Sequence, residues 1–266
     1  MKQLASKDNP LYKQLKKLAA SGGERKKQQL SLLEGVHLCE AYLAWQGMPV
    51  YAVFCRSRLN DDKPGHAALR VLHAQTDPQC VIELEKGLID SLESVPAGQG
   101  VVFFVSTPDP ALPAHIEENT LILDRVQDPG NVGSILRTAA AAGVRRVFLL
   151  QGCAAAWSPK VLRSSQGAHF SLLIHENLAW DALASHLRVP VAVTTLEQAQ
   201  SLYAQPLPAA CAWVFGHEGQ GVDGRIQAEA AHRYWIPQDA AAESLNVAAA
   251  AAVCLFEQRR QRLGAA

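Results

Sequence analysis

Short apolar runs alternate with longer amphipathic segments through the C-terminal half of the chain. Short apolar runs predict buried strands, whereas apolar residues that recur every three to four positions predict helices. The predicted strands cover residues 120–123, 146–150, 191–194, 213–215 and 234–236, and the predicted helices cover residues 132–142, 159–165, 178–186 and 246–262. This alternation is typical of an α/β fold with a mostly parallel sheet and helices on both faces. Such sheets bind their ligands in the loops that follow the strands.

The N-terminal region mixes the same two patterns in shorter stretches. Its predicted helices cover residues 9–20, 35–45 and 86–94, and its predicted strands cover residues 30–33, 50–54 and 101–105. Three prolines between residues 106 and 113 then interrupt the periodicity, which indicates a linker. We therefore expect a smaller N-terminal α/β domain over residues 1–105, a linker over residues 106–117 and a larger domain over residues 118–266.

The bulk composition narrows the class of protein. With 48% apolar and 19% charged residues, the chain can bury a sizeable core and is not expected to be disordered. The N-terminus lacks the apolar stretch of a signal peptide and no run is long enough to cross a bilayer, so we expect a cytoplasmic protein with no membrane partner. The six cysteines form no C-x-x-C pair, so we expect reduced thiols and no metal site.

Positive charge is concentrated at the N-terminus, although the whole chain has a net charge of zero. Residues 1–27 hold eight lysines and arginines against two acidic residues. A local basic patch of this kind is what phosphate binding requires, and it would make binding sensitive to salt. A solvated helix face would equally explain any single one of these lysines. The candidate contacts are Lys13, Lys16, Lys17, Arg25, Lys26 and Lys27.

The loop after the strand at residues 120–123 carries the first candidate polar groups. Asp128-Pro129-Gly130 supplies a turn, and Asn131 can cap the following helix with its side-chain oxygen. Arg137 lies less than two turns further along, so both side chains can serve the N-terminal end of that helix. Taken alone, a helix cap and a solvated arginine would explain this loop.

The loop after residues 213–215 contains three glycines within six residues. Glycine lets a backbone approach a ligand closely, and Glu218 places a carboxylate in the same bend. An ordinary glycine turn with a surface glutamate is the alternative, and His217 is more simply a bystander than a catalyst.

The third loop follows the strand that ends at Ile236 and precedes the long alanine-rich helix. Ser244 or Asn246 can cap that helix, whose free N–H groups favour an anionic ligand. A capped amphipathic helix that only packs on a partner would look the same.

In their order, content and spacing, the three loops resemble the three signature motifs of the SpoU–TrmH family of RNA ribose methyltransferases, in the SPOUT superfamily. Residues 158–168 also resemble the connecting region of that family. The resemblance is strong over residues 121–260 and weaker over residues 9–105. There, Asn9-Pro10-Leu11-Tyr12-Lys13 and Leu33-Glu34-Gly35 resemble the RNA substrate-binding domain of many members, which is similar in fold to a ribosomal protein.

This resemblance implies a deep trefoil knot, a homodimer, and methyl transfer from S-adenosylmethionine to a ribose 2′-hydroxyl of RNA. It implies that the methyl donor is held by Thr195, Leu196, Gly216, Ile236 and Leu245. The matching polar positions of the active site are Asn131, Arg137, Glu218, Ser244 and Asn246, and Arg163 joins the RNA contacts. His217, Ala240 and Ala248 depart from the family pattern, which often has a small residue, a glycine and a serine there.

Several alternatives stay open at this point. Arg137 is either the base that removes the hydroxyl proton or a cation that stabilises the alkoxide and grips the neighbouring phosphate, since arginine is nearly always protonated. Members of the family with the N-terminal domain often modify ribosomal RNA. We therefore favour ribosomal RNA over transfer RNA as the substrate of this chain. A non-catalytic RNA-binding protein of the same fold is a further reading. A dinucleotide-dependent oxidoreductase is disfavoured because the G-x-G-x-x-G turn is absent.

Overall fold

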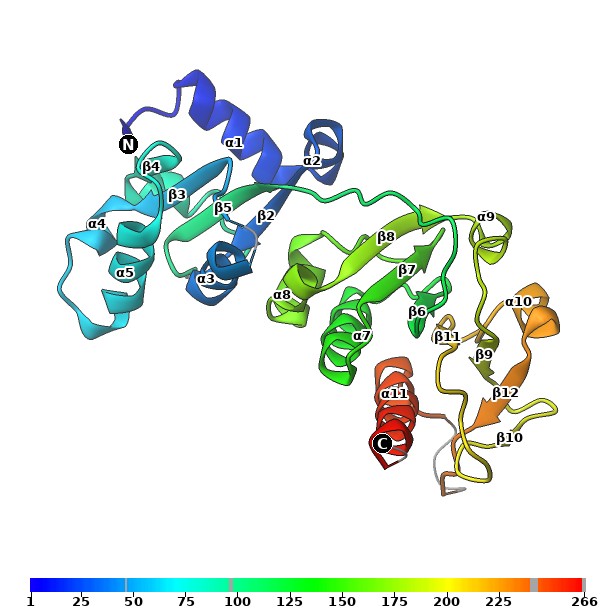
Figure 1. The fold of residues 1–266 in the computed structure, drawn as a ribbon. Helices are drawn as coiled ribbons and strands as arrows, with labels where there is room; N and C mark the ends of the chain where they lie inside the picture. The colour runs from blue at the N-terminus through cyan, green and yellow to red at the C-terminus, as the bar shows by residue number, and fades with distance from the viewer. Residues whose placement is uncertain (46, 96–97, 240–243, 265–266) are drawn as a thin grey trace. The chain divides into compact units, whose positions relative to one another are not determined.

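The computed structural model describes residues 1–45, 47–95, 98–239 and 244–264 (Figure 1). The chain divides into two compact units, the first formed by Met1–Pro108 with Trp157–Phe170 and the second by Asp109–Ala156 with Ser171–Ala266. The second unit thus begins within the proline-rich segment, and one segment of the expected larger domain groups with the first unit. The domain limits expected from the sequence stay a prediction, and Ala240 lies outside the described residues.

The first unit contains a mixed sheet of five strands, in the order β1-β4-β3-β5-β2. The strands are β1 (Lys2–Leu4), β2 (Leu30–Glu34), β3 (Tyr51–Cys55), β4 (Val81–Leu84) and β5 (Val101–Ser106). β5 runs antiparallel to both β2 and β3, while β4 runs parallel to β1 and β3. The helices are α1 (Pro10–Ala20), α2 (Gly22–Gln28), α3 (Val36–Trp45), α4 (Arg56–Leu59), η1 (Pro64–His66), α5 (Ala67–Gln75), α6 (Lys86–Ile89) and α8 (Pro159–Ser165).

The first helix shows how local sequence and packing agree. The Asn9 side chain accepts hydrogen bonds from the N–H groups of Leu11 and Tyr12 at 2.9 and 3.3 Å, which caps α1 where the sequence predicts its start. Tyr12, Leu15 and Leu18 lie on one face of the helix and are buried in the core of this unit. The lysines between them therefore point to solvent.

A parallel sheet of seven strands, in the order β10-β12-β9-β11-β6-β7-β8, forms the second unit. The strands are β6 (Thr120–Leu123), β7 (Arg146–Leu150), β8 (Leu173–Leu178), β9 (Val191–Thr194), β10 (Gln200–Ser201), β11 (Ala212–Phe215) and β12 (His232–Trp235). The helices are α7 (Pro129–Ala142), α9 (Trp180–Ala184), α10 (Gly224–Glu229) and α11 (Val247–Gly264), and η2 (Ala168–Ser171) is a short 3-10 turn at the boundary of the two units. Across the described residues, each pair of neighbouring strands in this sheet runs parallel, which confirms the predicted fold class.

Helices cover both faces of this sheet. Val214 and residues of the neighbouring strands share an apolar cluster with Trp180 of α9 and Ile226 of α10. The adjacent residue, Trp213, points to the opposite face, where its indole N–H donates to Gln258 of α11 at 3.0 Å. The alternation along one strand thus confirms the predicted two-faced burial. The trefoil knot stays a prediction.

The strand order brings the three candidate loops to one edge. β11 lies between β6 and β9, and its last residue, Phe215, is in register with Leu123 of β6. β12 pairs with the other side of β9. Because parallel strands share their C-terminal edge, the loops after β6, β11 and β12 all leave the sheet on the same side.

The predicted cap of α7 is wrong. Asp128, and not Asn131, occupies the N-cap position, where its side chain accepts the N–H of Asn131 at 2.9 Å. Proline at the first helical position after an N-cap aspartate favours this earlier start. The side chain of Asn131 is therefore free to contact residues that are distant in the sequence.

None of the helices in the described ranges combines the length and apolarity that a membrane crossing needs.

Candidate active site

Residues 216–222, which we call the glycine-rich loop, form a tight bend directly after β11. A Cβ at Gly216 would overlap the backbone of Gly221 and Val222, so glycine is required there. The backbone groups of His217 and Gly221 exchange two hydrogen bonds of 3.0 and 2.8 Å, which close the bend. The ring Nδ1 of His217 accepts the N–H of Gly219 at 3.0 Å. His217 therefore organises the loop.

Glu218 reaches from this loop to the loop after β6. Its carboxylate accepts hydrogen bonds from the Asn131 side chain at 3.0 Å and from the backbone N–H groups of Asp128 and Gln127 at 3.2 and 3.4 Å. Burial raises the pKa of Glu218, but the hydrogen bonds that it accepts outweigh burial and hold this pKa below its ordinary value. Glu218 is therefore an ionised acceptor at neutral pH.

Asn131 links this carboxylate to the third loop. Its side-chain oxygen accepts a hydrogen bond of 3.0 Å from the amide of Asn246. The Asn246 oxygen in turn caps α11 by accepting the N–H groups of Ala248 and Ala249 at 2.9 and 3.4 Å. One of the two caps that the sequence allowed for this helix is thus confirmed. We call Asn246, Asn131 and Glu218 the polar chain, since hydrogen bonds join them in that order and connect all three loops.

A cavity of about 320 Å³, the strand-end cavity, opens beside the polar chain. Its size lies in the range of small-molecule sites. All five residues assigned to the methyl donor and two of the five assigned polar residues line it; the seven are Thr195, Leu196, Gly216, Ile236, Leu245, Glu218 and Ser244. Within residues 1–45, 47–95, 98–239 and 244–264, no group of three or more His, Cys, Asp or Glu side chains is placed to hold a metal ion.

Arg137 differs from the other candidates. It lies on the exposed side of α7 and does not line the strand-end cavity. Among the described residues its guanidinium has no hydrogen-bond or ion-pair partner. An exposed cation without a partner is free to meet a phosphate or an alkoxide.

The candidate RNA-binding residues of the first unit fall into two groups. The side chains of Lys16, Lys17, Lys26 and Lys27 are exposed and have no ion-pair partner in the described part of the chain, and Lys13 pairs with Asp8 at 3.0 Å. These lysines remain in contact with solvent and can reach a polyanion.

The two candidate arginines, Arg25 and Arg163, are held in place instead. Arg25 donates to the carbonyl oxygens of Leu18 and Ala19 at 2.6 and 3.0 Å, near the end of α1. Arg163 donates to Ser94 Oγ at 2.7 Å and lies 3.4 Å from a carboxylate oxygen of Glu34. Their contacts serve the first unit itself.

Sequence reasoning missed the parts played by Asp128 and His217. Asp128 caps α7 and also offers its own N–H to Glu218, and the Asp-Pro pair was the available signal for it. The contact between His217 and its own loop had no signal, because it depends on the conformation of the glycines on either side.

Comparison with known proteins identifies the family. A family model described as the SpoU rRNA Methylase family matches residues 118–256. A tRNA/rRNA methyltransferase of Synechocystis, described as uncharacterized, is 36% identical over 98% of this chain and 95% of its own length. The 23S rRNA (guanosine(2553)-2′-O)-methyltransferase RlmP of Bacillus subtilis is 32% identical over 97% of this chain and 100% of its own length.

A solved structure agrees with these relatives. The AdoMet-bound rRNA methyltransferase from Sinorhizobium meliloti has a TM-score of 0.82 and 25% sequence identity, and the match covers 97% of each chain. Fold, sequence and the motifs around the polar chain therefore lead to one conclusion. The chain belongs to the SpoU rRNA methylase family.

Proposed function

We propose that this chain is an S-adenosylmethionine-dependent RNA methyltransferase that methylates a ribose 2′-hydroxyl in ribosomal RNA. The observation that carries the proposal is the polar chain, which joins three distant loops beside a cavity of small-molecule size. Family membership supports the methyl transfer, the name of the Bacillus subtilis relative supports the ribose of ribosomal RNA, and the AdoMet-bound relative supports the methyl donor.

The residues around the strand-end cavity fit such a methyl donor. Leu196 and Leu245 line the cavity and are 76% and 39% exposed, so their apolar surfaces are available to the flat ring of a ligand. The ionised carboxylate of Glu218 gives the cavity wall a negative charge that suits a cation. S-adenosylmethionine, when bound, supplies a methyl group on a positively charged sulfonium.

The polar residues then have distinct roles in the proposal. Glu218, Asn131 and Ser244 hold the reacting ribose, and Asn246 orders the third loop. Arg137 meets the ribose oxygen from outside the cavity, and its two roles, as base or as stabilising cation, both stay open. Positioning alone can lower the barrier of such a transfer by roughly 7–11 kcal/mol in favourable intramolecular cases.

The exposed lysines of α1 and α2 support RNA binding by the first unit, because phosphates need cations that are not already paired. The resemblance to the SpoU–TrmH family further leads us to propose a homodimer in the cytoplasm. A transfer-RNA substrate and a non-catalytic RNA-binding protein of the same fold are the alternatives.

A methylation assay tests this proposal directly. Purified protein is incubated with S-adenosylmethionine labelled in the methyl group and with ribosomal or transfer RNA stripped of modification. We expect label in ribosomal RNA, at one nucleotide that resists alkaline cleavage on its 3′ side, as 2′-O-methylation requires. Label only in transfer RNA would transfer the proposal to that substrate. Binding of both ligands without any label would favour the non-catalytic alternative.

A further inference from the structure

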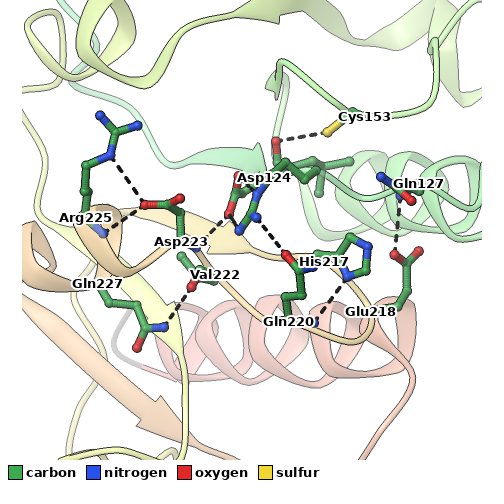
Figure 2. Close-up of polar contacts among 12 residues, drawn as sticks. Asp124, Gln127, Cys153, His217, Glu218, Gln220, Val222, Asp223, Arg225 and Gln227 are labelled. Atoms are coloured by element: carbon green, nitrogen blue, oxygen red, sulfur yellow. Dashed lines mark hydrogen bonds and ion pairs between the residues drawn. The ribbon is translucent and has the colours of Figure 1, made fainter.

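A second set of contacts joins the loop after β6 to the glycine-rich loop and is separate from the polar chain (Figure 2). Asp124 is the first residue after β6 and is buried, with 3% of its surface exposed. Its N–H donates to Phe215 at 2.8 Å, and its carboxylate accepts the N–H of Asp223 at 2.8 Å. One residue therefore holds the glycine-rich loop at both of its ends.

Arg125 extends this anchor to the middle of the loop. Its guanidinium donates two bonds of 3.0 and 3.1 Å to the Asp124 carboxylate and a third of 3.0 Å to the side-chain oxygen of Gln220. The backbone of Arg125 is in the left-handed region, with φ of 55°, where residues other than glycine occur when their surroundings enforce it. A Cβ on Gly152 would lie 3.1 Å from Arg125 Cγ, so a glycine leaves the room that this side chain needs.

These anchors bracket Glu218. Phe215 precedes it, Gln220 and Asp223 follow it, and all three are hydrogen-bonded to Asp124 or Arg125 at the end of β6. Three glycines give the loop freedom that its own internal bonds limit only in part. Neither Asp124 nor Arg125 lines the strand-end cavity, so within the described residues neither is placed to touch a ligand there.

We propose that Asp124 and Arg125 are positioning residues that hold the glycine-rich loop so that Glu218 meets Asn131. This inference rests on the proposed function, since Glu218 is given its role there. Asp124 and Arg125 act through Glu218 and take no part in the transfer itself.

Four variants test the anchor under single-turnover conditions with saturating RNA and S-adenosylmethionine. Asp124→Asn keeps the size but loses the charge that pairs with Arg125, and we expect the rate to fall by roughly tenfold to a hundredfold. Gln220→Ala, at an exposed position that folding should tolerate, should lower the rate by about threefold to tenfold. Gln220→Glu should restore it, because a carboxylate also accepts from Arg125.

Arg225→Ala is the matched control. Arg225 pairs with the same Asp223 at 3.6 Å, but its side chain is 72% exposed and it does not contact the end of β6. The rate of this variant should equal that of the unmodified protein. Equal losses in Gln220→Ala and Arg225→Ala would overturn the proposal.

Two further measurements separate positioning from general stability. Asp124→Asn should lower the rate by less than about twofold when Glu218 is already glutamine, because residues that act through one group are not additive. The same loss in both backgrounds would contradict the proposal. Hydrogen exchange needs no turnover: amides of residues 217–223 should exchange faster in Asp124→Asn, while those of α7 should not change. An unmodified protein that does not methylate RNA would refute the proposed function, whereas unchanged exchange would refute the anchor.

Discussion

The polar groups of the two units are organised in opposite ways. In the second unit, Glu218 accepts three hydrogen bonds, and Asn131 and Asn246 are tied to each other. In the first unit, the exposed lysines of α1 and α2 extend into solvent with few partners. The same sequence thus fixes one set of polar side chains and leaves the other loose.

This difference matches two kinds of chemistry. Methyl transfer needs the reacting atoms in one geometry, and a misplacement of about 1 Å can slow such a reaction by roughly a hundredfold. Phosphate neutralisation depends on charge near the backbone of the RNA and tolerates many geometries. Arg137 is an exception, because it belongs to the proposed catalytic set and yet, like the lysines, it is exposed and has no hydrogen-bond or ion-pair partner among the described residues.

The largest effect is expected from Arg137→Ala. Loss of the cation of the proposed catalytic set should lower the rate of methylation by about a hundredfold to a thousandfold or more. Binding of S-adenosylmethionine, measured by calorimetry, should stay within about threefold, because Arg137 does not line the strand-end cavity. Arg145→Ala removes an exposed arginine just beyond the other end of the same helix and should leave both values unchanged. Unchanged turnover in Arg137→Ala would remove this residue from the mechanism.

A smaller loss is expected when the polar chain is cut. Asn131→Ala removes its bonds to both Glu218 and Asn246 and should lower the rate by roughly tenfold to a hundredfold. Thr138→Ala is the control, since the Thr138 hydroxyl donates within its own helix, to the carbonyl oxygen of Ser134 at 2.9 Å. Equal rates of methylation in the two variants would mean that the polar chain does not contribute to catalysis.

The same variant has a signature in pH. The pKa of Glu218 lies below its ordinary value, so the carboxylate stays ionised to a lower pH than a free glutamate would. The stabilisation of the folded state by this carboxylate is therefore complete above the pKa of glutamate in the unfolded chain, about 4.3, and is lost as the pH falls through the folded pKa. Without the Asn131 amide this pKa should rise. The acid limb of the activity profile should therefore move to higher pH in Asn131→Ala and stay in place in Thr138→Ala.

Regular periodicity explains which elements the sequence predicts. Strands buried on both faces, such as β6 and β11, are almost entirely apolar, and the sequence predicts their bounds to within one residue. β8 was missed because its segment contains polar residues and it forms the edge of the sheet, where only one neighbour constrains it. α2 was missed because it buries no residue and begins with two glycines, so no apolar period marks it.

For the candidate site, the sequence predicts the arrangement of the loops but not the contacts of their side chains. That the three loops meet could be predicted, because a parallel sheet gathers the ends of its strands. The partner of each side chain could not. Asn131 and Asp128 are both good N-caps, and only the proline between them and the distance to Glu218 decide that Asn131 is the one left to bridge.

RNA binding by the exposed lysines of α1 and α2 should depend on their charge and not on their exact geometry. Replacing Lys16, Lys17, Lys26 and Lys27 together by alanine should weaken RNA binding at least tenfold near physiological salt and flatten its dependence on salt, by about 0.7 in the log–log slope for each phosphate that is no longer neutralised. The maximal rate at saturating RNA should not change. Lys63→Ala with Lys86→Ala, two lysines paired with Asp61 and Asp90 in the same unit, serves as control. A lower maximal rate would show that these lysines also order the active site.

The smallest effect tests whether Arg25 belongs with the loose lysines or with the fixed groups. Its two bonds to carbonyl oxygens near the end of α1 place it with the fixed groups, so Arg25→Ala should lower the free energy of unfolding by about 1 kcal/mol. The salt dependence of RNA binding should stay the same, because this guanidinium is already engaged. Lys26→Ala, the neighbouring exposed cation, should do the reverse, with stability kept within about 0.5 kcal/mol and a flatter salt slope. Chemical denaturation and RNA titration at three salt concentrations measure both. If the two variants flattened the salt slope equally, Arg25 would be an RNA contact. The hydrogen bonds of a basic side chain within the protein would then not predict whether that side chain binds RNA.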